Sequence, residues 1–204
     1  MIRTPKSEID DRLISFQGLL QRDEVDVAVI RQNADLFYFT GTVQDAHLIV
    51  PASGAPLFLV RRDVVRAGEQ SPIRPIHPLS SVKDLPQAIS EVCGHSPPKR
   101  LGLELDVLPA NTFFFFDQKL FPKQQIVDIS GSVRQVRMVK SPWEIEMMRR
   151  AGAVSRAVAD AVPTILREGI SELDLSIELE SVARRAGHLG LLRLRGFNMD
   201  MYFG

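Results

Sequence analysis

The sequence has little cysteine, no long apolar run and no excess of charge of either sign. Its one cysteine, Cys93, excludes a disulfide within the chain, which fits the reducing cytoplasm. Lys+Arg and Asp+Glu both number 25 among the 204 residues, so no basic surface indicates a nucleic-acid partner. No apolar stretch reaches the roughly 20 residues that cross a bilayer, and the first residues lack the apolar centre of a signal peptide. We therefore expect a cytoplasmic protein without membrane or nucleic-acid partners.

Short motifs of known chemistry are also scarce. The sequence contains no glycine-rich phosphate loop and no G-x-S-x-G motif, which disfavours nucleotide binding and one class of serine hydrolase. Cys93 ends a predicted helix, whereas a reactive thiol usually lies at a helix N-terminus beside a base, so a buried structural role is favoured. His77 and His95 have no cysteine or carboxylate at ligand spacing, and surface or capping roles are expected for them.

Helices and strands are predicted to alternate through about residue 129. Proline residues in the run 73–79 exclude a fully paired central strand there and favour a sheet edge. The runs 47–50 and 56–60 are separated by a turn that contains Gly54, which indicates a hairpin. The alternation therefore predicts an α/β domain with a mixed sheet flanked by helices. The expected strands are 25–30, 47–50, 56–60, 73–79, 101–105 and 124–130, and the expected helices are 7–21, 33–41, 61–70, 83–93 and 109–120.

The pattern becomes helical after residue 130. A short helix is predicted over 130–139, and Ser141, Pro142 and Glu144 then have the spacing of a capping box with proline at the first helical position. The helix that they begin is expected to reach about residue 167, although Pro163 favours a kink or an earlier end. Another helix is expected between residues 171 and 187.

The motifs at this change of pattern resemble a known family. The segments "RLGLELDVLP", "IVDISGSVRQVRMVKS" and "EIEMMRRAG" are similar to the join between two domains of the pita-bread metallopeptidases, which include Xaa-Pro dipeptidases (prolidases), Xaa-Pro aminopeptidases and creatinases. The upstream "NADLFYFTG" and "HLIVPASGAPLFLV" resemble the amino-terminal domain of that family. The resemblance implies a creatinase/prolidase-like amino-terminal domain at 1–130, a linker helix at 131–141, and the incomplete beginning of a pita-bread α+β catalytic domain at 142–204.

The resemblance also implies where the chemistry of such a protein lies. In the family, two aspartates, one histidine and two glutamates of the carboxy-terminal domain bind two divalent metal ions, here expected to be Mn, Co or Zn in a full-length parent. These ligands follow the strand that "LRLRGFNMDMYFG" resembles, where this chain stops. No catalytic or metal-binding residue is therefore expected in the chain, which by itself is predicted to be inactive. The late Asp160, Asp174, Asp200 and His188 have no partner at ligand spacing.

The loop between Gly41 and His47 is the candidate for contact with a substrate. The resemblance implies that in prolidase-like dimers the corresponding loop reaches toward the partner subunit's active site. Gln44, Asp45 and His47 are the polar groups that could close over a small peptide substrate there. The alternative is an ordinary solvated turn in which His47 begins the next strand.

Two further segments have a structural and a functional interpretation. The four phenylalanines at 113–116 are expected to pack in the core, with a partner interface as the alternative. Arg134, Arg137 and Lys140 share a helix face and are expected to be solvated, with an anion or the pair Glu144 and Glu146 as alternative partners.

The function that these patterns favour is the amino-terminal part of an Xaa-Pro dipeptidase/aminopeptidase-like metallopeptidase. This part would hold a homodimer together and cover the partner's active site. One alternative is a stand-alone, non-catalytic homologue that acts as an interaction module, because the apolar stripes of the two late helices would otherwise be exposed. The other is part of a creatinase-like amidinohydrolase, which shares the fold.

Overall fold

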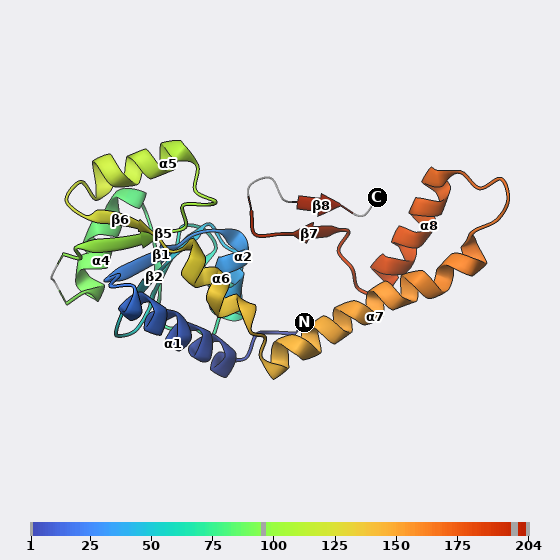
Figure 1. Ribbon diagram of the computed structural model, residues 1–204, viewed down its shortest axis with the longest axis horizontal. Coiled ribbons are helices and arrows are strands. Elements are labelled where there is room, and N and C mark those ends of the chain that lie inside the picture. Colours follow the sequence, from blue (N-terminus) through green and yellow to red (C-terminus); the bar gives the residue numbers. More distant parts are fainter. Residues whose placement is uncertain (1, 95–96, 197–199, 203–204) are drawn as a thin grey trace. The chain divides into compact units, whose positions relative to one another are not determined.

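The computed structural model describes residues 2–94, 97–196 and 200–202 (Figure 1). The chain divides into two compact units. The first contains Met1–Val139 together with Arg195–Phe197, and the second contains Lys140–Leu194 together with Asn198–Gly204. None of the helices in the described part of the chain is long and apolar enough to cross a membrane.

The first unit is built on a six-stranded mixed sheet with the order β4-β3-β2-β1-β5-β6. The neighbours β1–β2 and β2–β3 are antiparallel, whereas β3–β4, β1–β5 and β5–β6 are parallel. This confirms the predicted mixed sheet and its hairpin. The proline-containing β4 lies at an edge, as expected for a residue type that cannot donate to a neighbouring strand. The strands are β1 Val27–Ile30, β2 Ala46–Pro51, β3 Leu57–Val60, β4 Ile76–Pro78, β5 Arg100–Leu103 and β6 Gln125–Asp128.

Helices cover both faces of this sheet (Figure 1). One face carries α1 (Lys6–Arg22), α2 (Asn33–Thr40), α3 (Val64–Gln70) and α6 (Ser130–Met138), whose apolar residues share one buried cluster with alternate strand residues. The other face carries α4 (Leu85–Val92), which follows the 3₁₀ turn η1 (Val82–Asp84), and α5 (Ala110–Phe115), which continues as the π-helical η2 (Phe116–Leu120). The sheet therefore has a separate apolar core on each face, which confirms the layered architecture.

The helix α1 shows how the sequence specifies this packing. Ile9, Leu13, Phe16 and Leu20 recur at spacings of four, three and four, and each is at most 5% exposed. Such spacing places all four on one helix face, where the ring of Phe16 lies 5.1 Å from the ring of Phe39 in α2. Burial of side chains of this size contributes roughly 1.5–3 kcal/mol each.

The ends of α2 determine where the following loop begins. The side-chain oxygen of Gln32 accepts hydrogen bonds from the backbone N–H groups of Ala34 and Asp35 at 2.6 and 3.0 Å, which satisfies donors of the first turn. Gly41, at a φ of +75°, ends the helix, since glycine adopts this left-handed conformation without a steric penalty. The chain then turns directly into the loop that precedes β2.

The second unit contains two helices and a small hairpin. The side chains of Ser141 and Glu144 each bond the other's backbone N–H, forming the predicted capping box of α7 (Pro142–Ile165). This helix ends two residues after Pro163, as the missing N–H of proline favours. The helix α8 (Glu172–Arg185) begins at Ser171, and β7 (Leu191–Arg193) pairs with β8 (Asp200–Tyr202) in an antiparallel hairpin.

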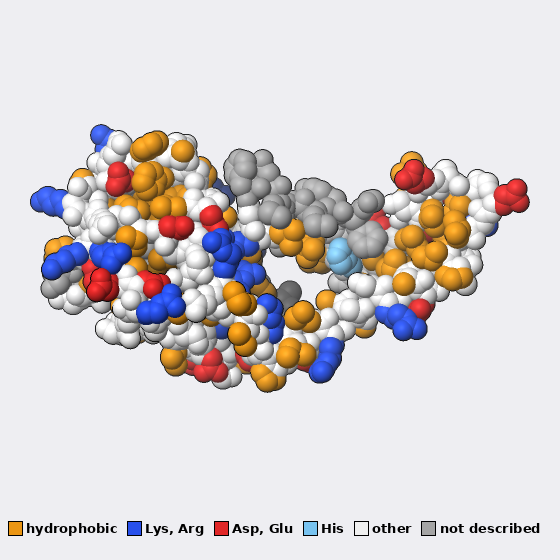
Figure 2. Space-filling model, viewed as in Figure 1, with side chains coloured by type: hydrophobic (Ala, Val, Ile, Leu, Met, Phe, Trp, Pro, Cys, Tyr) orange, Lys and Arg blue, Asp and Glu red, His pale blue; other side chains and the backbone are white. Residues whose placement is uncertain are grey.

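Apolar side chains of α7 and α8 remain exposed (Figure 2). The helix α7 has no buried residue, and Ala183 is the buried residue of α8. Met148, Leu173 and Ile177 are 59%, 70% and 54% exposed. None of these three residues belongs to the predicted stripes, whose members include the half-buried Met147, Val154, Leu175 and Leu179. The three exposed residues leave apolar surface in contact with water.

Candidate functional site

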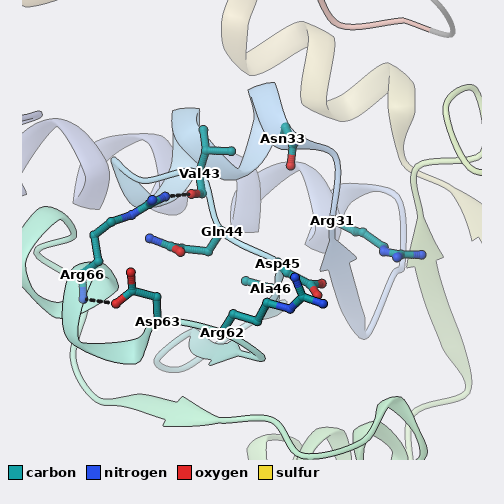
Figure 3. Close-up of a pocket in the computed structure, with 9 residues that line it drawn as sticks. All are labelled: Arg31, Asn33, Val43, Gln44, Asp45, Ala46, Arg62, Asp63 and Arg66. Atoms are coloured by element: carbon teal, nitrogen blue, oxygen red, sulfur yellow. Dashed lines mark hydrogen bonds between the residues drawn. The ribbon is translucent and has the colours of Figure 1, made fainter.

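A hollow of about 480 Å³ opens beside the loop between α2 and β2 (Figure 3). Its walls come from the end of β1, the start of α2, the loop itself and the connection between β3 and α3. Positive and negative side chains both line it, and the three arginines extend in different directions (Figure 3). The lining residues are Arg31, Asn33, Val43, Gln44, Asp45, Ala46, Arg62, Asp63 and Arg66.

Hydrogen bonds from neighbouring elements hold the loop in place. The hydroxyl of Thr42 donates to Oε1 of Gln70 at 2.6 Å, and Nε2 of Gln44 donates to Oγ1 of Thr42 at 2.9 Å. Nη2 of Arg66 donates to the backbone carbonyl of Val43 at 2.7 Å. Thr42 and Gln44 are only 1% and 7% exposed. The predicted site residue Gln44 therefore lines the hollow and also supports the loop from inside.

Asp45 is the predicted site residue with the greatest access to water. Its carboxylate is 37% exposed and lies 3.3 Å from Nη1 of Arg61. Arg62 and Asp63 line the same hollow, so Asp45 belongs to a wall of alternating charge. An ion pair this exposed contributes little to stability, which leaves the carboxylate able to exchange Arg61 for a charged ligand.

The structure does not bring His47 to the hollow. His47 lies within β2, where alternate residues point to opposite faces of the sheet, and its ring stacks on Phe116 at 6.5 Å between centroids. It is 1% exposed, and both ring nitrogens lack a hydrogen-bond partner. Burial lowers the pKa of His47 from 6.5 to about 4, and the positive charge of Arg31 acts in the same direction. His47 is therefore a neutral core residue, whereas Gln44 and Asp45 meet at the hollow.

A cluster of carboxylates and arginines lies at the carboxyl ends of β1 and β5. Oε2 of Glu104 accepts hydrogen bonds from the backbone N–H groups of Arg31 and Gln32 at 2.7 and 3.0 Å. Burial raises the pKa of Glu104 to about 8, with a hydrogen bond to Asp35 and the charge of Asp35 in the same direction, while the two backbone N–H groups oppose the shift.

Basic residues of α6 complete this cluster. Arg134 pairs with Asp106, and Nη1 of Arg137 lies 2.5 Å from Oδ1 of the fully buried Asp35. Arg134 is 57% exposed, as expected for a solvated face, whereas Arg137 is 32% exposed and pairs with a buried aspartate, so the expectation was wrong for Arg137. Sequence inspection missed the cluster, because the strand predicted at 101–105 includes Glu104, whereas the observed β5 ends at Leu103 and leaves Glu104 and Asp106 just beyond the strand, a common position for polar site residues.

The described side chains do not fit the two-metal site of the parent family. Among them, no group of three or more His, Cys, Asp or Glu is placed to hold a metal ion. The buried carboxylates Asp35 and Glu104 face guanidinium groups and backbone N–H donors instead. We therefore assign no metal chemistry to this cluster.

The remaining candidates do not line the hollow. Burial raises the pKa of the half-buried Cys93 thiol, and the charge of Asp26 acts in the same direction. Both effects favour the protonated thiol, which agrees with a structural role. His77 is exposed on β4, and Nδ1 of His188 accepts a hydrogen bond from the backbone of Gly190 at 2.9 Å. The side chains of His95 and Asp200 lie outside the described part of the chain. Asp160 pairs with Arg156, and Asp174 bonds the N-cap Ser171.

The phenylalanine run is divided between core and surface. Phe116 is 2% exposed, whereas Phe114 and Phe115 are 52% and 37% exposed. Four successive residues of a helical segment point in different directions, so one of them fills the core while two contact water.

Comparisons with known proteins identify the family. The family model described as the Creatinase/Prolidase N-terminal domain matches residues 12–139. An uncharacterized hydrolase/peptidase of Sinorhizobium fredii is 27% identical over 206 residues, which cover 89% of this chain and 51% of the relative. An Xaa-Pro dipeptidase of Pyrococcus horikoshii is 21% identical, over 86% of this chain and 47% of the relative. The solved structure of an Xaa-Pro dipeptidase from Bacillus anthracis has a TM-score of 0.79 at 19% identity, over 89% of this chain and 50% of that one.

These matches agree with the architecture described above. The chain spans about half the length of the curated relatives it matches, and the match is to the amino-terminal halves of Xaa-Pro peptidases. The structural similarity shows the shared fold. Because the family model covers more than half of the 204 residues, the chain belongs to the creatinase/prolidase amino-terminal domain family and corresponds to the amino-terminal part of the pita-bread Xaa-Pro peptidases.

Proposed function

We propose that the chain acts as the amino-terminal part of a cytoplasmic Xaa-Pro dipeptidase/aminopeptidase-like metallopeptidase. In this role it mediates homodimerisation and covers the partner's active site with the loop at residues 41–47. The observation that carries the proposal is the family match over residues 12–139, together with a loop that internal hydrogen bonds hold beside a charged hollow. Loops on a rigid scaffold are where binding residues concentrate.

The charges of the hollow suit a small zwitterionic peptide. An Xaa-Pro dipeptide carries an ammonium group and a carboxylate, and the hollow offers both Asp45 and the guanidinium groups of Arg31 and Arg62. Asp45 would attract the ammonium group, and an arginine would attract the carboxylate. Gln44 keeps the loop in the conformation that presents Asp45.

The proposal assigns catalysis to a segment other than these 204 residues. Two divalent metal ions, Mn, Co or Zn, would be bound by the carboxy-terminal half of a full-length parent and would activate water there. The 204-residue protein, incubated with Ala-Pro and Mn²⁺ or Co²⁺, is expected to release no proline above a metal-only blank. Proline release that a chelator abolishes would contradict this assignment.

Dimerisation has a direct physical test. Sedimentation equilibrium of the purified chain is expected to give about twice its monomer mass of 22.8 kDa, in keeping with the two-fold pairing usual in soluble oligomers. A monomer mass at every concentration up to about 100 µM, a range well above typical dimer dissociation constants, would remove the dimer from the proposal.

The role of the loop is tested separately in a full-length peptidase that contains this chain. Asp45→Asn keeps the size of the side chain and removes its charge, so KM for Ala-Pro is expected to rise while kcat changes little. Asp117→Asn, on η2, is the matched control and should leave both constants unchanged. Equal effects of the two variants would show that Asp45 does not contact the substrate.

Exposed apolar residues of α7 and α8 favour one alternative, a non-catalytic interaction module. Leu173 and Met148 are 70% and 59% exposed, and apolar surface of this kind usually marks a partner interface. The mass of the protein isolated from its natural source separates the two functions. A mass well above 22.8 kDa supports the peptidase, whereas a mass near that value supports the interaction module.

A further inference from the structure

The guanidinium group of Arg195, in the first unit, lies among three acidic side chains. Nε of Arg195 donates to Oδ2 of Asp35 at 2.5 Å, and Nη1 and Nη2 donate to the two carboxylate oxygens of Asp106 at 2.5 and 2.9 Å. Nη2 also lies 3.9 Å from Oε1 of Glu104. The Arg195 side chain is only 9% exposed. Each of its three nitrogens therefore faces a carboxylate oxygen away from bulk water.

The three acidic side chains come from two segments that the sheet brings together. Asp35 lies in the first turn of α2, and Glu104 and Asp106 follow β5. Because β1 and β5 pair in parallel, their carboxyl ends lie side by side. Open α/β sheets commonly bind ligands at this edge. Asp35 is fully buried, and Glu104 is 3% exposed. We refer to Asp35, Glu104 and Asp106 as the acidic socket.

The socket carries an oxygen that no ordinary contact satisfies. Oε1 of Glu104 is buried and accepts no hydrogen bond, although an orphaned buried acceptor is costly. Arg137 and Arg134 of α6 also pair with Asp35 and Asp106. That oxygen lies 3.9 Å from Nη2 of Arg195, so the guanidinium group faces all three members of the socket.

We propose that the acidic socket is a guanidinium-binding site and that Arg195 is its intramolecular ligand. A planar guanidinium group bridges Asp35 and both oxygens of Asp106 at once, whereas the ammonium group of lysine is a point charge that cannot meet all three atoms. The socket thereby fastens residues 195–196 to the amino-terminal domain through one side chain. This inference concerns the first unit alone and does not depend on the peptidase proposal.

The first test removes the ligand and supplies it again from solution. In Arg195→Ala, hydrogen exchange of peptides from β1 and β5 is expected to become at least about tenfold faster, because several charge-assisted hydrogen bonds are lost. Methylguanidinium at millimolar concentration is expected to restore slow exchange in a saturable way. Methylammonium, which has the same charge but no fork of donors, is expected to have no such effect.

A matched variant separates the socket from general charge effects. Arg156→Ala removes an arginine that also pairs with an aspartate, Asp160, but its side chain is 77% exposed on α7, so β1 and β5 should exchange as in the parent and methylguanidinium should change nothing. If methylguanidinium slows exchange equally in both variants, or in neither, the proposal is wrong.

A conservative variant tests the geometry independently. Arg195→Lys keeps the charge and is expected to fold, yet exchange in β1 and β5 should remain faster than in the parent. Parental protection in Arg195→Lys would show that one positive charge is sufficient, which would overturn the assignment of a guanidinium site.

Discussion

Gly102 of β5 lies directly against Ile129. A Cβ placed on Gly102 would come within 2.4 Å of Cγ2 of Ile129 and 3.2 Å of Cγ1 of Val25. Both neighbours are core residues, and Ile129 is 1% exposed. Glycine is therefore required here by close packing, since the φ of this residue is not in the left-handed region. The contact joins the central parallel strands to the start of α6.

Gly102→Ala is expected to destabilise the first unit by roughly 1–3 kcal/mol, because an added methyl group must displace Ile129 or the strand itself. Urea unfolding followed by hydrogen exchange of β5 peptides measures the change within this unit. Gly131→Ala is the matched control, since nothing lies within 4 Å of a Cβ at that position in α6. There alanine should be neutral or stabilise the helix by up to about 1 kcal/mol. Equal losses in both variants would contradict the packing argument.

The buried His47 makes the first unit sensitive to acid. Burial lowers the pKa of His47 from 6.5 to about 4, so between these values the unfolded chain binds a proton that the folded chain does not. The contribution of His47 to stability is therefore fully present above pH 6.5. It is lost as the pH falls toward 4, by roughly 3 kcal/mol in total. In His47→Phe this contribution disappears, so the unfolding free energy should fall with rising pH between 4.5 and 6.5, where His47 and Glu104 offset each other in the parent.

His77→Gln is the control for that experiment, because His77 is exposed. Its curve of unfolding free energy against pH should follow the parent between pH 4 and 6.5. A parental slope in His47→Phe would mean that His47 is protonated in the folded protein, in conflict with its unpartnered ring nitrogens.

Glu104 has the opposite effect on the dependence of the unfolding free energy on pH. Burial and Asp35 raise its pKa from 4.5 to about 8, so the folded chain retains a proton that the unfolded chain has lost. The resulting stability is fully present below pH 4.5 and is lost as the pH rises through 8, by at most about 5 kcal/mol. Between pH 4.5 and 6.5 this fall and the rise due to His47 offset each other, so stability should be greatest there.

Glu104→Gln tests the alkaline limb. The amide oxygen can still accept from the backbone N–H groups of Arg31 and Gln32, and the amide group does not titrate in this pH range. The fall between pH 6.5 and 8 should therefore be removed, whereas the exposed control Glu69→Gln should retain it. A parental alkaline limb in Glu104→Gln would show that another group titrates.

Local patterns predicted the elements, and long-range contacts account for what was missed. The face of α1 and the capping box at Ser141 are readable because they depend on residues three or four positions apart. Asp35 and Glu104 meet only because β1 pairs with β5 in parallel. The spacing of residues along the chain does not indicate which strands pair. His47 was grouped with Gln44 and Asp45 as a polar residue of the same loop. It lies within β2, whose six residues are all buried, so its polarity did not indicate an exposed position.

The capping box of α7 provides a test confined to the second unit. Oγ of Ser141 accepts from the backbone N–H of Glu144 at 3.1 Å, and the Glu144 carboxylate accepts from the backbone N–H of Ser141 at 2.9 Å. Ser141→Ala removes the first of these bonds and is expected to cost α7 about 1 kcal/mol. Amide exchange in the first turn of α7 should become about fivefold faster, since 1.4 kcal/mol corresponds to a factor of ten. Ser155→Ala makes the same chemical change at an exposed position within α7, where alanine favours the helix and exchange should slow or stay constant. Faster exchange in Ser155→Ala as well would mean that loss of a serine hydroxyl, and not loss of the cap, weakens the helix.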